Sequence, residues 1–142
     1  MPVTKKIFIS FDFEHDRNYR YLLSALNENT GSEIVFDDLT PSEIQSSDIG
    51  RIKAALTRKL GGATHTLVII GKHGNSFHPD RIAIRTRNWQ WWEIEKSKEL
   101  RKKLIAVKIE RANATPTPLL NAQAMWAYSF NVPAIVQAIK SA

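Results

Sequence analysis

The chain has 142 residues, 43% of them hydrophobic, and its 20 lysines and arginines outnumber its 14 aspartates and glutamates, which gives a formal net charge of +6. This length suits a single domain spanning residues 1–142, and no apolar run approaches the roughly 20 residues that cross a bilayer. The absence of cysteine excludes disulfides, thiol catalysis and thiolate metal sites, and the lack of an apolar leader with a cleavage site predicts a cytoplasmic protein.

The first third of the chain alternates between strand and helix patterns. Two short runs rich in β-branched and aromatic residues predict strands over 5–11 and 32–36. Between them, apolar residues recur at helical spacing from Asp16, the expected N-cap, to about Asn29. A proline and several acids predict a loop over 37–46.

The middle of the chain predicts a helix, a central strand and a long loop. The helix starts at Ser47 or Asp48 and ends at the glycine pair 61–62. Residues 64–70 are almost continuously apolar and β-prone, as in a strand covered on both faces. Residues 71–87 are polar and predict a loop that leads into the next helix.

A helix that begins after the N-cap Asn88 holds three of the four tryptophans. Trp89 and Glu93 lie four residues apart and therefore share one face of this helix. The positive end of the helix dipole and the nearby Arg85 and Arg87 favour negative charge, so we expect Glu93 to be ionised beside an indole.

The rest of the chain predicts two strands and a final helix. Residues 103–109 form an apolar fourth strand, and 113–120 a loop with two prolines. Residues 124–128 predict a short fifth strand at a sheet edge, followed by a helix over about 132–140.

This alternation predicts an α/β fold, because each crossover helix returns the chain to the same sheet in the same direction. We expect a flavodoxin-like, five-stranded, mainly parallel sheet in the order 2-1-3-4-5, with helices on both faces. Ligands of such sheets bind outside the carboxyl ends of the strands. The loops at 11–16, 37–46 and 71–88 should therefore converge on one rim.

Four motifs in these segments together resemble a TIR domain. Residues 8–16, Phe-Ile-Ser-Phe-Asp-Phe-Glu-His-Asp, resemble the first TIR box, and Ser-Asp-Ile at 47–49 and Leu-Val-Ile-Ile at 67–70 resemble the second helix and third strand. The segment 89–94, Trp-Gln-Trp-Trp-Glu-Ile, is similar to the family's Trp-Cys-x-x-Glu-Leu. The resemblance covers about residues 5–110 and is closest to the prokaryotic TIR-like proteins of the ThsB type in Thoeris antiphage systems.

Two positions depart from the family pattern. Gln90 stands in place of the cysteine, although the family's chemistry rests on the glutamate that follows. The loop 37–46 lacks the Pro-Gly typical of many TIR domains, which bears on any contact between TIR domains through that loop.

The resemblance implies cleavage of the bond between nicotinamide and ribose in NAD, in some cases with closure of the product into a cyclic signal for antiphage defence. NAD is then the substrate, and no cofactor is expected. Glu93 is the expected catalytic residue, because an ionised carboxylate can hold the ribose hydroxyls and stabilise an oxocarbenium-like transition state. The candidate substrate-binding residues are Ser10, Phe11, Asp12, His73, Arg85 and Trp89.

These candidates have different expected roles. Phe11 and Trp89 would form apolar or stacking walls, Ser10 and Asp12 would contact ribose or phosphate, and Arg85 would pair with a pyrophosphate. Structural alternatives stay open, since Phe11 also fits a core position and Arg85 a solvated loop.

One loop holds two histidines and an aspartate, His73, His78 and Asp80. Their spacing matches no metal site, so we expect none, and His73 is kept as a candidate contact for the nucleotide.

The main alternative to an enzyme is a non-catalytic TIR-like module that assembles through its tryptophan cluster. A flat, exposed Trp91 and Trp92 patch with Glu93 closed off in a salt bridge would favour the module, whereas a pocket that holds Glu93 would favour the enzyme. Nucleic-acid binding rests on charge alone and is not expected. The expected partners are NAD or a related nucleotide, other TIR domains, and an effector that senses the product, with no membrane.

Overall fold

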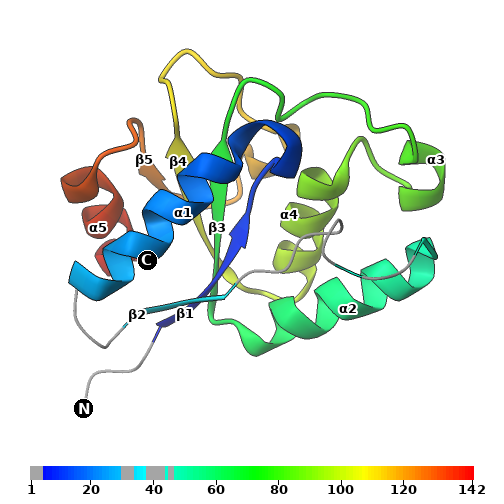
Figure 1. Ribbon diagram of the computed structural model, residues 1–142, viewed down its shortest axis with the longest axis horizontal. Helices are drawn as coiled ribbons and strands as arrows, with labels where there is room; N and C mark the ends of the chain where they lie inside the picture. The colour runs from blue at the N-terminus through cyan, green and yellow to red at the C-terminus, as the bar shows by residue number, and fades with distance from the viewer. Residues whose placement is uncertain (1–4, 30–33, 38–43, 45–46) are drawn as a thin grey trace.

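The computed structural model describes residues 5–29, 34–37, 44 and 47–142, in which strands and helices alternate along the chain (Figure 1). The strands are β1 (Lys5–Ser10), β2 (Ile34–Asp37), β3 (His65–Ile70), β4 (Lys103–Lys108) and β5 (Met125–Ala127). They form one sheet in the order β2-β1-β3-β4-β5, and each neighbouring pair is parallel. The predicted α/β fold with a parallel sheet is therefore confirmed.

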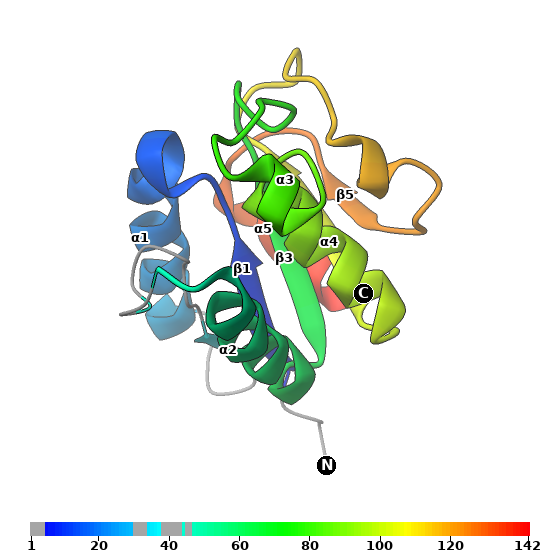
Figure 2. The same cartoon turned by 90° about the vertical axis from the view of Figure 1, so that its right-hand side faces the viewer.

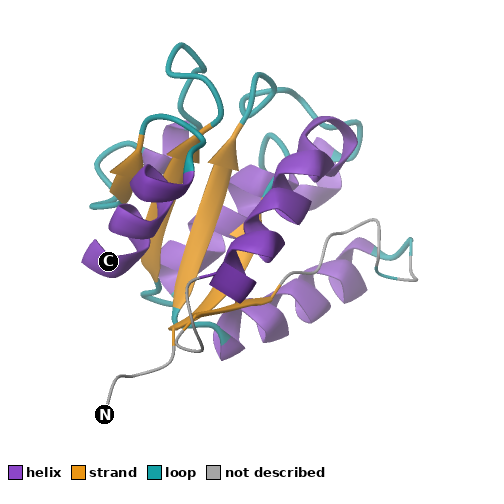
Figure 3. Ribbon diagram, turned by 60° about the vertical axis from the view of Figure 1, so that its left-hand side comes forward, coloured by secondary structure: helices purple, strands orange, loops and turns teal. Residues whose placement is uncertain are grey.

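The helices lie in two layers on either side of this sheet. They are α1 (Phe13–Asn29), α2 (Ile49–Gly62), the short α3 (Arg81–Ile84), α4 (Trp89–Glu99) and α5 (Val132–Ser141), with a 3-10 turn η2 at Thr117–Leu119. Figures 1 and 2 show α1 and α5 on one face and α2 and α4 on the other. In Figure 3 the loops at the carboxyl ends of the strands gather at one end of the sheet.

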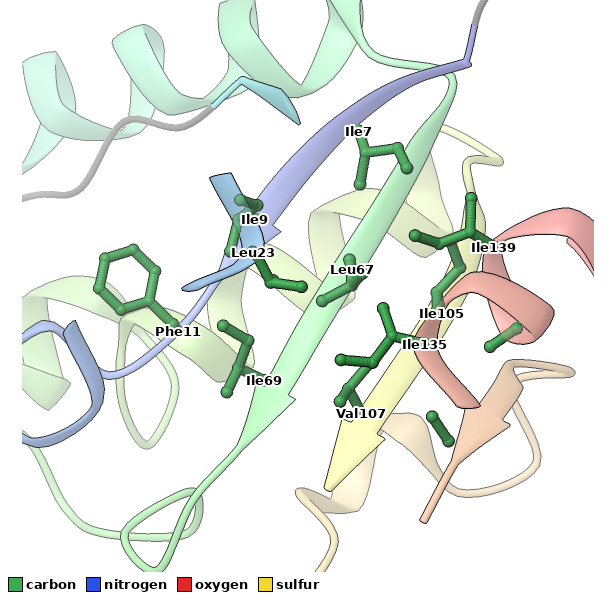
Figure 4. Packing of buried hydrophobic residues seen from close by; sticks show 12 residues of the cluster. Ile7, Ile9, Phe11, Leu23, Leu67, Ile69, Ile105, Val107, Ile135 and Ile139 are labelled. Atoms are coloured by element: carbon green, nitrogen blue, oxygen red, sulfur yellow. The ribbon is translucent and has the colours of Figure 1, made fainter. Parts of the chain in front are cut away.

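The central strand β3 packs into both helix layers, and all six of its residues are buried. Leu67 and Ile69 belong to the cluster shown in Figure 4, which α1 and α5 cover. Val68 and Ile70 face the opposite layer, where they meet α4. A third cluster forms where α2 packs on Phe8 of β1. This burial on two faces explains why β3 lacks polar alternation in the sequence.

The first helix begins earlier than its pattern predicts. The Asp12 carboxylate accepts a hydrogen bond from the backbone N–H of Glu14 at 3.1 Å, and Asp16 N donates to Asp12 O at 2.8 Å within the first turn. The prediction that Asp16 caps the helix is therefore wrong. Both aspartates are good capping residues, and Asp12, one turn earlier, lies nearest the strand end.

The other two predicted N-caps are confirmed. Asp48 Oδ1 accepts a hydrogen bond from Arg51 N at 3.1 Å at the start of α2. Asn88 Oδ1 accepts one from Trp91 N at 2.8 Å at the start of α4. These caps fix the starts of two helices on the rim at the carboxyl ends of the strands.

Two other boundaries differ from the sequence-based expectation. Helix α2 continues through the glycines at 61–62 and is capped by Ala63 in an extended conformation, with φ of −88°, so no left-handed glycine ends it. Helix α3 lies inside the predicted loop 71–87, and its four residues are too few to show helical periodicity. The predicted loop 37–46 lies almost wholly outside the described residues. No helix in the described part of the chain has both the length and the apolar character to cross a membrane.

Candidate active site

The end of the first strand and the tryptophan-rich helix meet at a buried pair, Ser10 and Glu93. The Ser10 hydroxyl donates to Glu93 Oε1 at 2.7 Å, and the Glu93 side chain is only 3% exposed. One turn further along α4, Ser97 Oγ donates to Glu93 O at 2.7 Å and lies 2.8 Å from Thr66 Oγ1 of β3. The first bond holds the Glu93 side chain of α4 against the end of β1. The other two hold α4 against β3.

Burial raises the pKa of Glu93 to about 8, and the hydrogen bond from Ser10 offsets part of this rise. No ion pair to Glu93 occurs among the described residues. The expectation of an ionised Glu93 is therefore wrong for the free protein, in which the carboxyl group is mostly protonated at neutral pH. Desolvation outweighs the helix dipole, because the carboxyl group lies under the helix and not at its solvated end.

Gln90, which replaces the family's cysteine, has a structural role that the sequence does not reveal. Its Nε2 donates to Ile69 O at 2.8 Å and to Ser10 O at 3.2 Å, and the side chain is buried. The amide therefore joins the carboxyl ends of β1 and β3 to the start of α4. Gln90 and Glu93, which is one helical turn further along α4, therefore both bond Ser10.

A cavity of about 450 Å³ opens beside this pair, which is within the usual range for small-molecule sites. Its lining residues come from four segments, 11–15, 47–52, 73–80 and 88–90. These segments follow β1, precede and open α2, follow β3 and open α4, so they meet on the predicted rim. Neither Glu93 nor Ser10 is among the described lining residues, although Phe11, which follows Ser10, and Gln90, one turn before Glu93, are.

Two aromatic residues of the lining are close in sequence to the buried pair: Phe11 follows Ser10, and Trp89 lies one helical turn before Glu93. Phe11 packs in the main core cluster, as its structural alternative predicted, and also lines the cavity. Trp89 is half-buried and meets Trp92 edge to face, with ring centroids 5.8 Å apart. Phe11 and Trp89 therefore both contribute aromatic rings to the cavity lining, and their role as walls for a substrate stays a prediction.

Acidic and imidazole side chains gather on the same lining. Asp12 Oδ2 lies 2.7 Å from His15 Nδ1, and the His15 ring stacks on His73 with centroids 3.9 Å apart. The hydrogen bond to Asp12 raises the pKa of His15. His15 was not among the candidates predicted from the sequence. Its position three residues after Asp12, one helical turn away, was a signal for this contact.

Asp16 lies behind this group, with 7% of its surface exposed. Its Oδ2 has no hydrogen-bond partner, and burial, then the charge of Asp12, raises the pKa of its carboxyl group. A Cβ at Gly71, directly after β3, would lie only 2.0 Å from Asp16 Oδ2. The absence of a side chain at Gly71 therefore makes room for this carboxyl group.

Arg85, a candidate substrate-binding residue, is not among the described residues that line the cavity. Arg85 ends α3 in the left-handed conformation, with φ of 70°, and is exposed away from the cavity lining. Arg87 is also off the lining, with its guanidinium 4.3 Å from the centroid of Phe77 and 4.9 Å from that of Trp91. Phe77, which sequence reasoning missed, is 64% exposed and lines the cavity.

The described residues contain no group of three His, Asp or Glu side chains arranged to hold a metal ion. The site is therefore a cavity with aromatic walls, carboxyl groups and imidazoles, next to a buried and mostly protonated glutamate.

Comparisons with known proteins bear on this site. No curated protein sequence matches the chain significantly. Among solved structures, a 2-deoxyribosyltransferase from Bacillus psychrosaccharolyticus has a TM-score of 0.60 and 14% identity over 89% of this chain and 88% of that one. A prokaryotic SEFIR domain has a TM-score of 0.57 and 13% identity over 97% of this chain and 95% of its own. Both likenesses show the fold alone.

The family of this chain is assigned from its sequence. The family model described as the TIR-like domain of the Thoeris protein ThsB matches residues 8–114, which include Ser10, Gln90 and Glu93. The chain therefore belongs to the family of TIR-like domains of the Thoeris protein ThsB.

Proposed function

We propose that this protein cleaves the bond between nicotinamide and ribose in NAD, with Glu93 as the catalytic carboxyl group. The observation that carries the proposal is the buried Ser10–Glu93 pair beside a cavity of about 450 Å³ at the carboxyl ends of the strands. Membership of the ThsB family supports it. The product, linear or closed into a ring, would serve as a signal that a downstream effector reads in antiphage defence.

The proposed step needs one carboxylate and one water. As the C–N bond breaks, its electron pair moves to the pyridinium nitrogen, so nicotinamide leaves as a neutral molecule. Positive charge develops on the ribose, where Glu93 stabilises it and holds the ribose hydroxyls. Water then adds to the ribose carbon and releases one proton, which gives ADP-ribose, or a second group of the same substrate adds and closes a ring.

The substrate itself would create the active form of Glu93. In the free protein the pKa of Glu93 is about 8, so the charged form is in the minority at neutral pH. A bound pyridinium cation would lower this pKa, because an opposite charge nearby favours the carboxylate. The hydrogen bond from Ser10 also favours the ionised form. Ionisation is thereby coupled to substrate binding.

The alternative is a module that only assembles with other proteins. The lack of an ion pair to Glu93 among the described residues argues against a glutamate closed off in a salt bridge. Glu93 is buried and off the cavity lining, so the proposal needs the substrate to reach it past the lining residues Phe11 and Gln90. Trp91 is held in place by its indole N–H, which donates to Gly74 O and Asn75 Oδ1 at 3.0 Å. Self-association with other TIR domains remains part of the proposal and rests on membership of the family.

The test measures, by chromatography, the release of nicotinamide from NAD by the purified protein. The protein is used at high concentration, because TIR enzymes are often inactive until they assemble. We expect Glu93→Gln to reduce release by about 10²-fold or more while the circular dichroism spectrum is unchanged. The matched control is Glu95→Gln on the same helix, whose exposed carboxylate accepts a hydrogen bond from Thr86 Oγ1 at 2.9 Å. Glu95→Gln should keep nearly full activity.

The pH dependence of the same assay tests whether the ionised form of Glu93 is the active one. We expect kcat/KM of the wild-type protein to rise about tenfold per pH unit below a pKa of about 8 and to level off above it, because kcat/KM reports the free enzyme. Equal release by the wild-type and Glu93→Gln proteins would remove Glu93 from the mechanism.

A further inference from the structure

Two imidazoles on the cavity lining, those of His15 and His78, differ in the nitrogen that carries the proton. His15 Nδ1 lies 2.7 Å from Asp12 Oδ2, and a carboxylate can only accept, so Nδ1 carries the proton and Nε2 of the neutral ring is an acceptor. His78 is the reverse, because its Nδ1 accepts a hydrogen bond from Asp80 N at 2.9 Å and its proton is therefore on Nε2. Neutral His15 can thus take up a proton from a ligand, whereas neutral His78 can only donate one.

The ring of His15 is held in one orientation by two neighbours. Asp12 accepts a hydrogen bond from Glu14 N through Oδ1 at 3.1 Å and binds His15 through Oδ2, so one carboxylate both caps α1 and orients the imidazole. The ring also stacks on His73 of the loop after β3, with centroids 3.9 Å apart and ring planes 28° apart. The side chain of His15 is nevertheless 47% exposed, so a ligand in the cavity can reach it.

The proposed reaction needs a proton acceptor besides Glu93. The hydroxyl that attacks the ribose carbon must lose a proton as its C–O bond forms, while Glu93 balances the positive charge on the ribose. Glu93 is buried and off the lining, whereas His15 is on it. The hydrogen bond to Asp12 raises the pKa of His15, and the charges of Glu14 and Asp16 act in the same direction, which makes the imidazole a stronger base.

The segment that leaves β1 brings the carboxyl group and the imidazole to one end of the sheet. Ser10 holds Glu93, the next residue Phe11 lines the cavity, and Asp12 holds His15. The Cα atoms of Ser10 and Asp12 can be at most about 7 Å apart, because only one residue separates them. A ribose that contacts Glu93 on one side can therefore present an attacking hydroxyl to His15 on the other.

We propose that His15, oriented by Asp12, accepts the proton of the hydroxyl group that attacks the ribose carbon. This inference rests on the proposed function and adds a second catalytic residue to it, with Asp12 as a positioning residue. After nicotinamide has left, an oxygen lone pair of water forms the C–O bond, the O–H bond breaks, and the proton moves to His15 Nε2. A hydroxyl of the same substrate would lose its proton to the same atom when the product closes into a ring.

The test compares two nucleophiles, of which only one has a proton to lose. Attack by water gives ADP-ribose. Isotopically labelled nicotinamide attacks through the lone pair of its ring nitrogen, loses no proton and gives labelled NAD. Both reactions need the first C–N bond to break beside Glu93. One incubation of NAD with labelled nicotinamide therefore measures hydrolysis by chromatography and exchange by mass spectrometry, and the ratio of the two rates reports the proton acceptor.

Removal of the imidazole should affect one reaction and spare the other. We expect His15→Ala to lower the formation of ADP-ribose by about 10²-fold and to change exchange by less than about threefold. Added imidazole should raise hydrolysis by this variant about tenfold and leave the wild type unchanged. The matched control is His78→Ala, which removes a lining imidazole with the opposite tautomer and should keep the wild-type ratio of hydrolysis to exchange.

The variant Asp12→Asn tests the positioning role. Asparagine caps helices as well as aspartate does, so the first turn of α1 should be kept. With Oδ1 still bonded to Glu14 N, the amide group would offer a donor to His15 Nδ1 and move the imidazole proton to Nε2. We expect about a 10²-fold loss of hydrolysis with exchange unchanged. Nitrogen NMR spectra of the imidazoles read the tautomer of His15 in both proteins without any substrate.

The possible results separate this inference from the proposed function. A proton on Nε2 of neutral His15 in the wild type would overturn the inference, whether or not NAD is cleaved. Hydrolysis and exchange that fall together in His15→Ala, or that both stay at the wild-type rate, would also overturn it, while the proposed function would stand. A wild-type protein that neither hydrolyses NAD nor exchanges its nicotinamide would overturn the proposed function and the inference with it. A selective loss of hydrolysis that imidazole restores supports the inference.

Discussion

The buried carboxyl group of Glu93 makes the stability of the fold depend on pH. Burial raises its pKa from the ordinary 4.5 to about 8. Between these two pH values the folded protein binds one more proton at this group than the unfolded chain does. The free energy of unfolding therefore falls as the pH rises from 4.5 to 8, by about 1.4 kcal/mol per pH unit, on the order of 5 kcal/mol in all.

Replacement by glutamine removes this dependence. We expect Glu93→Gln to be more stable than the wild type at pH 9 by several kcal/mol and close to it at pH 5, because only the charged carboxylate is costly to bury. Urea unfolding of both proteins at the two pH values measures the difference, in which all other titrating groups cancel. Parallel pH profiles would mean that Glu93 titrates normally.

At this scale the sequence predicts the identity of the site residues better than their state. The position of Ser10 at a strand end and of Glu93 on the tryptophan-rich helix predicts their neighbourhood, and the two side chains are joined by a hydrogen bond. The protonation of Glu93 was not predictable, because it depends on desolvation by β1 and β3, which lie far away in sequence. Likewise, Arg85 is close to Glu93 along the chain yet exposed beyond α3.

At the scale of elements, the close approach of the first turn of α1 to the end of β3 shapes the rim. We expect Gly71→Ala to lower the free energy of unfolding by about 1–3 kcal/mol, because its Cβ would lie 2.0 Å from the Oδ2 of the buried Asp16. Asp16→Ala removes both the clash and an unpartnered buried oxygen. The double variant should therefore recover most of the loss.

Urea unfolding of the wild type, both single variants and the double variant gives the coupling energy between the two positions. The matched control is Gly61→Ala in α2, where an added Cβ meets nothing within 4 Å. That change should be neutral or stabilising by up to about 1 kcal/mol, since alanine is the better helix former. Losses that simply add would show that Asp16 and Gly71 do not meet.

The periodic elements of this rim were predictable and its short ones were not. The starts of α2 and α4 followed from the capping residues Asp48 and Asn88. Helix α3 and the exposed Phe77 gave no signal, because a four-residue helix and a single loop aromatic have no periodicity to detect. The first turn of α1 was misplaced because two aspartates compete for the cap.

At the scale of the whole molecule, charge is divided between the surface and the cavity. The lysines and arginines give the chain a charge of +6, and yet the described lining holds only carboxylates and imidazoles as ionisable groups. Net charge alone therefore did not predict the charge of the site.

The two ends of the described chain are joined by one side chain, Lys5 of β1. Its Nζ donates to Ile139 O at 2.7 Å and to Ala142 O at 3.1 Å, at the C-terminal end of α5, where Ile139 O also accepts a hydrogen bond from Ala142 N at 3.3 Å. We expect Lys5→Met to lower the free energy of unfolding by about 1–2 kcal/mol, because these carbonyls lose a charged donor and the helix dipole loses its partner.

Chemical denaturation measures the loss, and amide hydrogen exchange locates it. Exchange should become faster in the last turn of α5 and stay unchanged in α2, which Lys5 does not contact. The matched control is Lys6→Met, because Lys6 is exposed, follows Lys5 in the same strand and is bonded to Thr64 through its backbone. If both variants were equally stable, the Lys5 contact would contribute nothing, and packing of Ile135 and Ile139 on the sheet would hold α5 without it.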